Sequence, residues 1–369
     1  MSLTEGTPEF DLAESVGPDL RLGDLIGKSE LADFLDMPLA YGSAPGRADL
    51  RKAVAGLHGA APDDVVITVG GMQALSLIAA ILCEKGDEVV VTSPQFPNTL
   101  AALGATDAEI RSLPLSFDDR YRLDPETLGE ALSPRTRLVC LTSPQNPSGV
   151  LTPTETIWKV VRLMERVCPD SWLLIDETYR HALYGSDIAA PSVISISPRI
   201  ITCASLSKCH GAPGLRLGWA ITRDETLREQ LILAKFNGVI CNSTIDEALG
   251  LKVLQRHDAI VGERRGHLAD CLERVADWVR ANDAFVEWVR PHAGALCCVR
   301  LKPAVFDAAG VEHFYTALHR QGVRVGNGAW FGEEPRVFRL GFGLLPAAQL
   351  DAALRRMTAA LRQAQVAAA

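Results

Sequence analysis

The chain has 369 residues, of which 47% are hydrophobic and 22% are charged, and its formal net charge at pH 7 is −8. This length and composition are typical of a folded protein of about two domains, and the apolar runs are too short for a membrane-spanning helix. The negative charge argues against a nucleic-acid or anionic-membrane partner.

The first part of the chain predicts an α/β domain. From residue 64 to 222, short apolar runs alternate with amphipathic helical stretches, such as those at 72–86 and 153–167. Strands that are apolar throughout are typical of a mostly parallel sheet covered by helices on both faces. The predicted strands are 65–69, 88–92, 137–142, 172–176, 199–205 and 218–222.

The second part predicts a smaller α+β unit. A long charged stretch from 242 to about 282 is read as helical. Beyond it we expect strands at 285–289, 295–301 and 337–342 and helices at 311–322 and 347–363. We therefore expect a large domain over residues 36–262, and a small domain formed by residues 1–35 together with 263–369.

Nine cysteines are present, and none forms a Cys-x-x-Cys pair. Since their number is odd and most lie in apolar stretches, we interpret them as free thiols of a cytoplasmic protein, and we expect no metal site. The first ten residues are acidic and polar and lack the basic and apolar regions of a signal peptide.

Lys208 is the first candidate for chemistry. It ends the segment Ser205-Leu206-Ser207-Lys208, directly after a predicted strand. The carboxyl end of a strand is where open α/β sheets bind ligands, and a partly desolvated lysine there can attack an aldehyde. A solvated lysine at a strand end is the alternative that this segment alone leaves open.

A phosphate site is the second candidate. The strand 65–69 runs into two glycines and a helix, so the backbone N–H groups of Gly71 and Met72 would lie at a helix N-terminus. Arg216, eight residues after Lys208, and the hydroxyls of Ser205 and Ser207 could complete the site. A glycine-rich turn without these partners would be weak evidence.

Three further residues follow predicted strands. Asp176 ends the strand 172–176, where it could pair with a protonated ring nitrogen or simply remain an exposed carboxylate or helix cap. Tyr179 and Asn146 could each bond a phenolate oxygen, although the Asn-Pro-Ser-Gly segment at 146–149 is also a good turn.

Taken together, these residues form part of a series of motifs in a characteristic order. The motifs are Tyr-Gly-Ser-Ala-Pro-Gly at 41–46, Gly-Gly-Met at 70–72, Ser-Pro-Gln-Phe at 93–96, Asn-Pro-Ser-Gly at 146–149, Asp-Glu-Thr-Tyr at 176–179, Ser-Leu-Ser-Lys at 205–208, Gly-Leu-Arg-Leu-Gly-Trp at 214–219 and Phe-Arg-Leu-Gly-Phe at 338–342. Over nearly all of its length the chain resembles the aspartate-aminotransferase superfamily of pyridoxal phosphate enzymes (fold type I).

The resemblance implies a role for each matching residue. Lys208 would hold pyridoxal phosphate as an aldimine and later move a proton, Asp176 would pair with the pyridine nitrogen, and Tyr179 would bond the ring's 3′ oxygen. The other implied cofactor contacts are Gly70, Gly71, Met72, Phe96, Asn146, Ser205, Ser207, Arg216 and, from the neighbouring subunit of a homodimer, Tyr41.

The implied substrate contacts are Arg339, Asn146, Glu14 and Trp330. Arg339 would bind the α-carboxylate with both arms of its guanidinium. Glu14 and Ser15 lie in a short N-terminal arm that replaces the family's usual glycine-containing segment, so these two residues are possible substrate contacts or helix caps. Met72 stands where many members carry a hydroxyl, and only its backbone N–H could therefore serve the phosphate.

The activity implied is that of an aminotransferase moving an amino group from an L-amino acid to a 2-oxo acid. The same residues would also serve a pyridoxal phosphate-dependent lyase or cyclase, and the short arm weakly resembles the amidino-amino-acid cyclase branch of the superfamily. A regulator that keeps the fold is a third possibility, but no helix-turn-helix or basic extension is visible in the chain.

Overall fold

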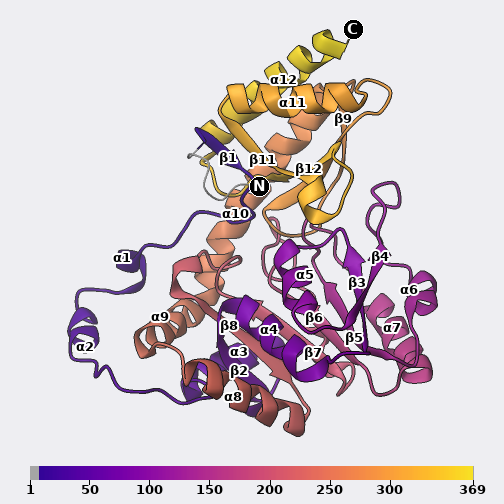
Figure 1. Cartoon of the computed structure of the whole chain (residues 1–369). Helices are drawn as coiled ribbons and strands as arrows, with labels where there is room; N and C mark the ends of the chain where they lie inside the picture. Colours follow the sequence, from indigo (N-terminus) through magenta and orange to yellow (C-terminus); the bar gives the residue numbers. More distant parts are fainter. Residues whose placement is uncertain (1–7, 369) are drawn as a thin grey trace.

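A seven-stranded sheet forms the centre of the larger domain in the computed structural model, which describes residues 8–368 (Figure 1). Its strands lie in the order β2-β8-β7-β6-β5-β3-β4, and β8 runs antiparallel to both of its neighbours, whereas the other hydrogen-bonded pairs are parallel. The predicted α/β fold with a mostly parallel sheet is therefore confirmed. The strands are β2 Val65–Val69, β3 Glu88–Ser93, β4 Glu109–Pro114, β5 Thr136–Thr142, β6 Trp172–Asp176, β7 Ile200–Ser205 and β8 Leu217–Thr222.

The edge strand β4 was not predicted. Leu113 is its one buried residue, so this segment lacks the apolar run that identifies the other six strands.

Residues along the central strands alternate between two buried faces. In β2, the side chains of Val65 and Ile67 belong to the core on one face, and that of Val66 belongs to the core on the other. Because helices cover both faces, these strands are apolar throughout. The first face is covered by α3 Ala48–His58, α6 Pro125–Ala131, α7 Thr154–Val167 and α9 Thr244–Gln255, and the second by α4 Gly70–Leu82, α5 Pro97–Gly104 and α8 Glu225–Val239; short 3-10 helices are η1 Pro62–Asp64, η2 Val193–Ser195 and η3 Pro213–Leu215.

A five-stranded sheet in the order β1-β11-β12-β10-β9 forms the smaller domain. Its hydrophobic core includes the fully buried rings of Phe306, Phe314, Phe338 and Phe342. The short strands β1 and β11 were not predicted. The elements are β1 Phe10–Leu12, β9 Val286–Val289, β10 Leu296–Leu301, β11 Val323–Asn327, β12 Val337–Gly341, α10 His257–Ala281, α11 Ala308–Arg320, α12 Ala347–Ala368 and the 3-10 helix η4 Gly328–Phe331.

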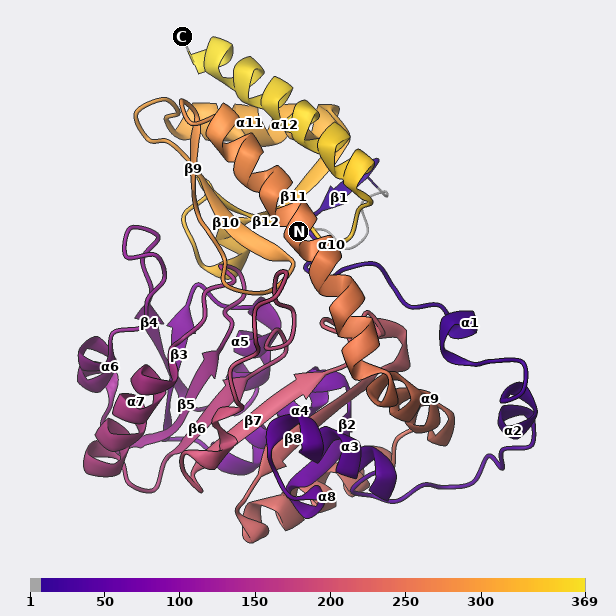
Figure 2. The same cartoon turned by 180° about the vertical axis from the view of Figure 1, so that it is seen from behind.

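The long charged helical stretch consists of two helices, α9 and α10, which meet at Arg256. Figure 2 shows α10 running from the large domain up along the small one, so this helix connects the two domains. No helix in residues 8–368 combines the length and the apolar character needed to cross a membrane.

The N-terminal arm is divided between the domains. β1 pairs in parallel with β11, in the small-domain sheet. The helices α1 Leu22–Leu25 and α2 Leu31–Leu35 instead lie along the large domain, where Leu25 joins the core and Glu30 forms an ion pair with Lys252 at 2.5 Å. The arm thus contacts both domains, and the domain boundary that we expect at residue 35 stays a prediction.

Candidate active site

Lys208 and Asp176 both lie at the carboxyl end of the large sheet. Asp176 is the last residue of β6 and is paired with Cys203 of β7, and Lys208 follows the end of β7 by three residues. The parallel register of β6 and β7 brings their ends to the same edge. The two residues that the strand-end argument selected therefore lie at the same edge of the sheet.

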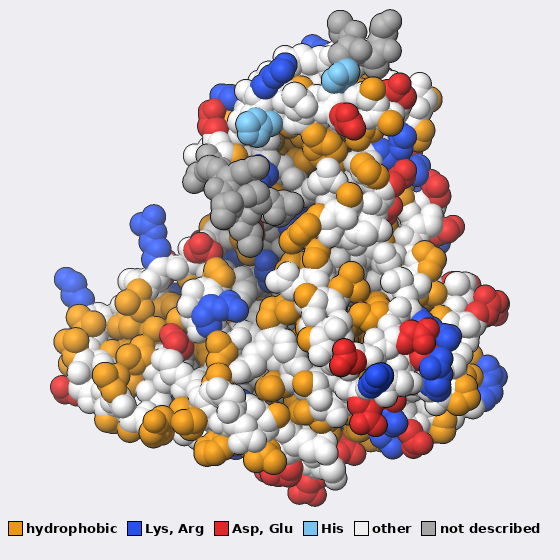
Figure 3. Space-filling view, viewed as in Figure 1, with side chains coloured by type: hydrophobic (Ala, Val, Ile, Leu, Met, Phe, Trp, Pro, Cys, Tyr) orange, Lys and Arg blue, Asp and Glu red, His pale blue; other side chains and the backbone are white. Residues whose placement is uncertain are grey.

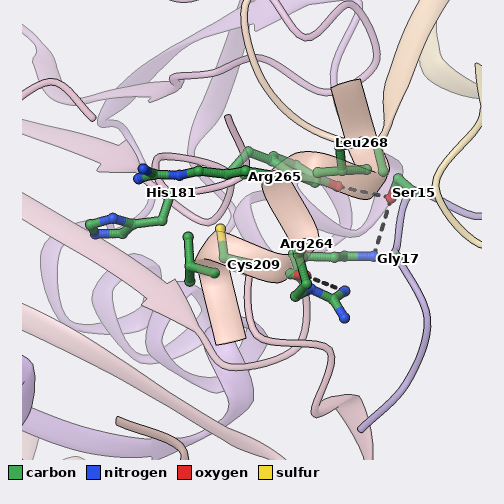
Figure 4. A pocket seen from close by; sticks show the side chains of 12 residues that line it. Ser15, Gly17, His181, Cys209, Arg264, Arg265 and Leu268 are labelled. Atoms are coloured by element: carbon green, nitrogen blue, oxygen red, sulfur yellow. Dashed lines mark hydrogen bonds between the residues drawn. The ribbon is translucent and has the colours of Figure 1, made fainter. Parts of the chain in front are cut away.

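A buried serine joins Lys208 to Tyr179. The Nζ of Lys208 donates a hydrogen bond to the Oγ of Ser15 at 3.1 Å, and the same oxygen lies 2.8 Å from the Tyr179 hydroxyl. Figure 4 shows Ser15 where these two bonds meet. Ser15 belongs to the N-terminal arm, which therefore reaches directly into the site.

The environment of Lys208 favours the neutral amine. Desolvation lowers its pKa to about 8, and the positive charge of Arg339 adds to this effect, while the carboxylates of Glu14 and Asp176 oppose it. A lysine with such a pKa is neutral for part of the time near neutral pH, so it can act as a nucleophile or a base.

Burial raises the pKa values of Asp176 and Tyr179, whereas it lowers that of Lys208. Desolvation raises the pKa of the Asp176 carboxyl, and the N–H of Thr178, which donates to Oδ1 at 2.9 Å, opposes this shift. A cation placed beside this carboxylate would therefore be stabilised. Burial also raises the pKa of Tyr179 to about 12, so its hydroxyl keeps its proton and can donate a hydrogen bond.

Arg339 faces the same space from the small domain. Its side chain is buried, and its Nη1 donates to the Oδ1 of Asn146 at 2.8 Å, while Nη2 donates to the carbonyl of Ala13. The guanidinium carbon lies 4.5 Å from the centre of the Phe331 ring, and Nε has no hydrogen-bond partner among the described residues. Burial lowers the pKa of this guanidinium, so a carboxylate ligand would be favourable here.

The residues predicted to bind a phosphate come together where the start of α4, the end of β7 and Arg216 adjoin. A Cβ atom on Gly70 would lie 2.5 Å from Nη2 of Arg216, and one on Gly218 would overlap the backbone of Gly70 and Gly71. Glycine at both positions therefore allows the arginine and strand β8 to approach the helix N-terminus closely. These groups fit a phosphate dianion.

The hydroxyls of Ser205 and Ser207 adjoin this cradle. A Cβ on Gly71 would be 3.8 Å from that of Ser205, whose Oγ accepts a hydrogen bond from the N–H of Ser207 at 3.3 Å. Met72 follows Gly71 in the first turn of α4, so its N–H belongs to the helix N-terminus as expected.

Aromatic side chains close the site between the domains. Phe96 is half-buried and packs edge-on against Trp330, with ring centres 6.1 Å apart. Trp330 in turn packs on Phe331, the ring that lies under Arg339. The structure thus brings both predicted aromatics to the site.

Tyr41 is not brought to the site of its own chain. Its side chain is 82% exposed. The turn that carries it is held firmly, because Nζ of Lys235 donates to the carbonyl of Ala44 at 2.7 Å and the N–H of Ile67 donates to that of Pro45 at 2.9 Å.

A small cavity at Lys208 is lined by predicted site residues and by Arg264, which the sequence did not identify. It is lined by Ser15, Tyr179, Lys208 and Arg264, among others (Figure 4). Arg264 of α10 donates from Nη2 to the carbonyl of Lys208 at 3.3 Å, and from Nη1 to that of Pro18. It therefore ties the lysine's backbone to the arm, but in the sequence it is one charged residue of a charged helix.

Comparison with known proteins gives the family. The family model for class I and II aminotransferases matches residues 32–357. The chain is 28% identical to arginine–pyruvate transaminase of Pseudomonas aeruginosa, over 96% of this chain and 88% of that one. It is also 28% identical to capreomycidine synthase of Streptomyces vinaceus, over 86% of this chain and 79% of the relative.

The fold agrees. A pyridoxal phosphate-dependent aminotransferase from Streptococcus suis superposes with a TM-score of 0.88 at 24% identity, covering 96% of this chain and 94% of that one. Membership implies pyridoxal phosphate as the cofactor, and the cradle at Gly70, Gly218 and Arg216 fits it. The resemblance noted in the sequence is confirmed: the chain belongs to the class I and II aminotransferases.

Proposed function

We propose that this enzyme transfers the amino group of an L-amino acid to a 2-oxo acid. The observation that carries the proposal is Lys208 at the carboxyl end of the sheet, where its lowered pKa suits proton transfer and the charges of Asp176 and the buried Arg339 act on it. The name of the relative arginine–pyruvate transaminase describes the same pairing of an amino acid with a 2-oxo acid.

The residues that would hold pyridoxal phosphate divide into three groups. Gly70, Gly71, Met72, Ser205, Ser207 and Arg216 would bind the phosphate, Asp176 the ring nitrogen, and Asn146, Tyr179 and Phe96 the 3′ oxygen and the ring face. When bound, the cofactor supplies an electron sink for the α-carbon.

The chain's own residues would position and move the proton. Arg339 binds the α-carboxylate in a bidentate geometry, which orients the Cα–H bond. Lys208 would hold the cofactor covalently, and its Nζ would remove the Cα proton of the bound substrate. Ser15, hydrogen-bonded to that nitrogen, keeps it directed toward Tyr179.

The attachment site is tested by borohydride reduction of the loaded enzyme followed by peptide mapping. We expect the cofactor on Lys208 in the wild type and no covalent label in Lys208→Ala, which still binds the cofactor through its phosphate and ring contacts. A label on another lysine would overturn the site.

A lyase or cyclase is the second candidate, because capreomycidine synthase is among the relatives. Both reactions begin with the loss of the Cα proton, so the residues above do not distinguish them. Analysis of the products distinguishes the two reactions. Transamination yields a 2-oxo acid and the pyridoxamine form of the cofactor, whereas elimination releases ammonia and leaves the pyridoxal form unchanged.

We also propose a homodimer in which Tyr41 reaches the partner's phosphate site. An exposed tyrosine on a firmly held turn supports a contact outside its own chain. Hydrophobic side chains gather over α1 and α2 in Figure 3, which supports a covered surface there. The exposed large hydrophobic residues of the arm and of the α8–α9 region include Leu22, Leu31, Leu35, Leu39, Phe236, Val239, Ile240 and Ile245.

Subunit complementation tests the shared site. Lys208→Ala and Tyr41→Ala chains carrying different tags, each nearly inactive as a homodimer, are mixed under conditions that exchange subunits. If Tyr41 acts across the interface, each hybrid has one complete site and activity returns. Hybrids that form but stay inactive would show that Tyr41 serves its own chain.

A further inference from the structure

Glu14 lies between the two residues through which the arm contacts the site. Ala13 accepts a hydrogen bond from Arg339, and Ser15 accepts one from Lys208. A Cβ on Gly341 would overlap the carbonyl oxygen of Glu14, so this glycine of β12 allows the arm to lie directly against the small-domain sheet. The backbone position of Glu14 is therefore set from both sides.

The carboxylate of Glu14 acts on both cations of the site. It raises the pKa of Lys208 and that of Arg339, against the larger opposing effect of desolvation in each case. The Glu14 side chain is half-buried, and within residues 8–368 no hydrogen bond or ion pair to its carboxylate occurs.

In the loaded site, three charged residues would each face a group of opposite charge, and Glu14 would not. Arg216 would face the cofactor phosphate, Asp176 the protonated ring nitrogen and Arg339 the α-carboxylate. Glu14 remains as an anion with no counterpart in the cofactor or in the common part of an amino acid. A partly buried carboxylate is most stable when it is paired with a cation.

We propose that Glu14 selects substrates whose side chain carries a cationic group, an ammonium or a guanidinium. This inference rests on the proposed aminotransferase function and names the substrate class of the same site. A guanidinium could bind the carboxylate through two parallel N–H bonds, whereas an ammonium would act as a point charge. An acidic side chain would be repelled.

Pairs of substrates with the same shape isolate the charge. Amino-donor half-reactions of the holoenzyme are followed through the cofactor spectrum with arginine and its neutral isostere citrulline, and with ornithine and its neutral isostere norleucine. We expect kcat/KM for arginine to exceed that for citrulline by about 10- to 100-fold, as for a hydrogen bond to a charged group.

Variants assign the preference to Glu14. Glu14→Gln keeps the shape of the side chain and should bring the arginine-to-citrulline ratio close to one. Glu312→Gln removes the same charge from the exposed outer surface of α11 and should leave the ratio unchanged. A wild type that prefers citrulline or an acidic donor, or a ratio unaltered in Glu14→Gln, would overturn the proposal.

A binding measurement separates this inference from the reaction type. α-Methylornithine and α-methylnorleucine lack the Cα hydrogen, so they bind without turnover, and their dissociation constants follow from titration of the cofactor absorbance. If the cationic analogue binds more tightly than the neutral one in the wild type but not in Glu14→Gln, the role of Glu14 is supported. This holds even if no donor is transaminated, and in that case only the proposed function fails. Equal binding of the two analogues would overturn the role of Glu14.

Discussion

A protonated Lys208 should destabilise the cofactor-free protein, and the size of the effect follows from its pKa. Desolvation, with help from Arg339, lowers that pKa from 10.5 to about 8. Since one pKa unit corresponds to about 1.4 kcal/mol, the charged lysine lowers the free energy of unfolding by about 3 kcal/mol at pH 7.

The sign of the pH dependence follows from proton binding. Below pH 8 the lysine is protonated in both states, and the full destabilisation is present. Between pH 8 and 10.5 the folded protein loses the proton while the unfolded chain keeps it, so stability rises with pH in this window. Above 10.5 the destabilisation is gone.

The variant Lys208→Met tests this pH dependence of stability, because methionine fills a similar space without a charge. Urea unfolding of the cofactor-free wild type and variant is compared from pH 6 to 9.5. The stability advantage of Lys208→Met should be constant below pH 8 and smaller by about 2 kcal/mol at pH 9.5. The lost bond to Ser15 offsets the advantage by about 1 kcal/mol at low pH, without removing the slope.

Lys85→Met is the matched control, since Lys85 is exposed. The difference in the free energy of unfolding between this variant and the wild type should not change with pH over the same range. A difference for Lys208→Met that is equally flat would refute the reasoning, because the lysine would then titrate alike in the folded and unfolded states.

The remaining predictions concern turnover and the arm. Asp176→Ala should lower kcat by about 100-fold or more while the cofactor stays bound, because a carboxylate beside the ring nitrogen stabilises developing charge. Asp176→Glu keeps the carboxylate and should be less affected, and a near-normal kcat in Asp176→Ala would contradict this. Arg339→Lys should raise KM for amino acids by about 10- to 100-fold, because lysine cannot form the bidentate pair, and cofactor affinity from titration should change little; an unchanged KM would mean that another group binds the carboxylate. Ser15→Ala removes an acceptor that favours the protonated lysine, so the pH midpoint for covalent cofactor attachment to the cofactor-free protein should fall, whereas Ser15→Thr should retain it.

Much of the large domain follows from local sequence. The strands ending in Asp176 and Ser205 are buried on both faces, so they appear as continuous apolar runs, and the residues after them must lie at the carboxyl edge of a parallel sheet. The strands that escaped prediction are those with little apolar signal. β4 buries one residue, and β1 has only three residues, whose pairing partner lies more than 300 positions away.

The contacts that complete the site were decided by tertiary structure. The bonds of Ser15 to Lys208 and Tyr179 join residues 193 and 164 positions apart, and Arg264 reaches the lysine's backbone from a helix whose sequence shows only charge. Arg339 was identified by its resemblance to a family motif, but its burial and its bond to Asn146 depend on how the two domains meet. Periodicity and motifs report what a segment buries locally, whereas the environment that lowers the pKa of Lys208 forms only when arm, sheet and small domain pack together.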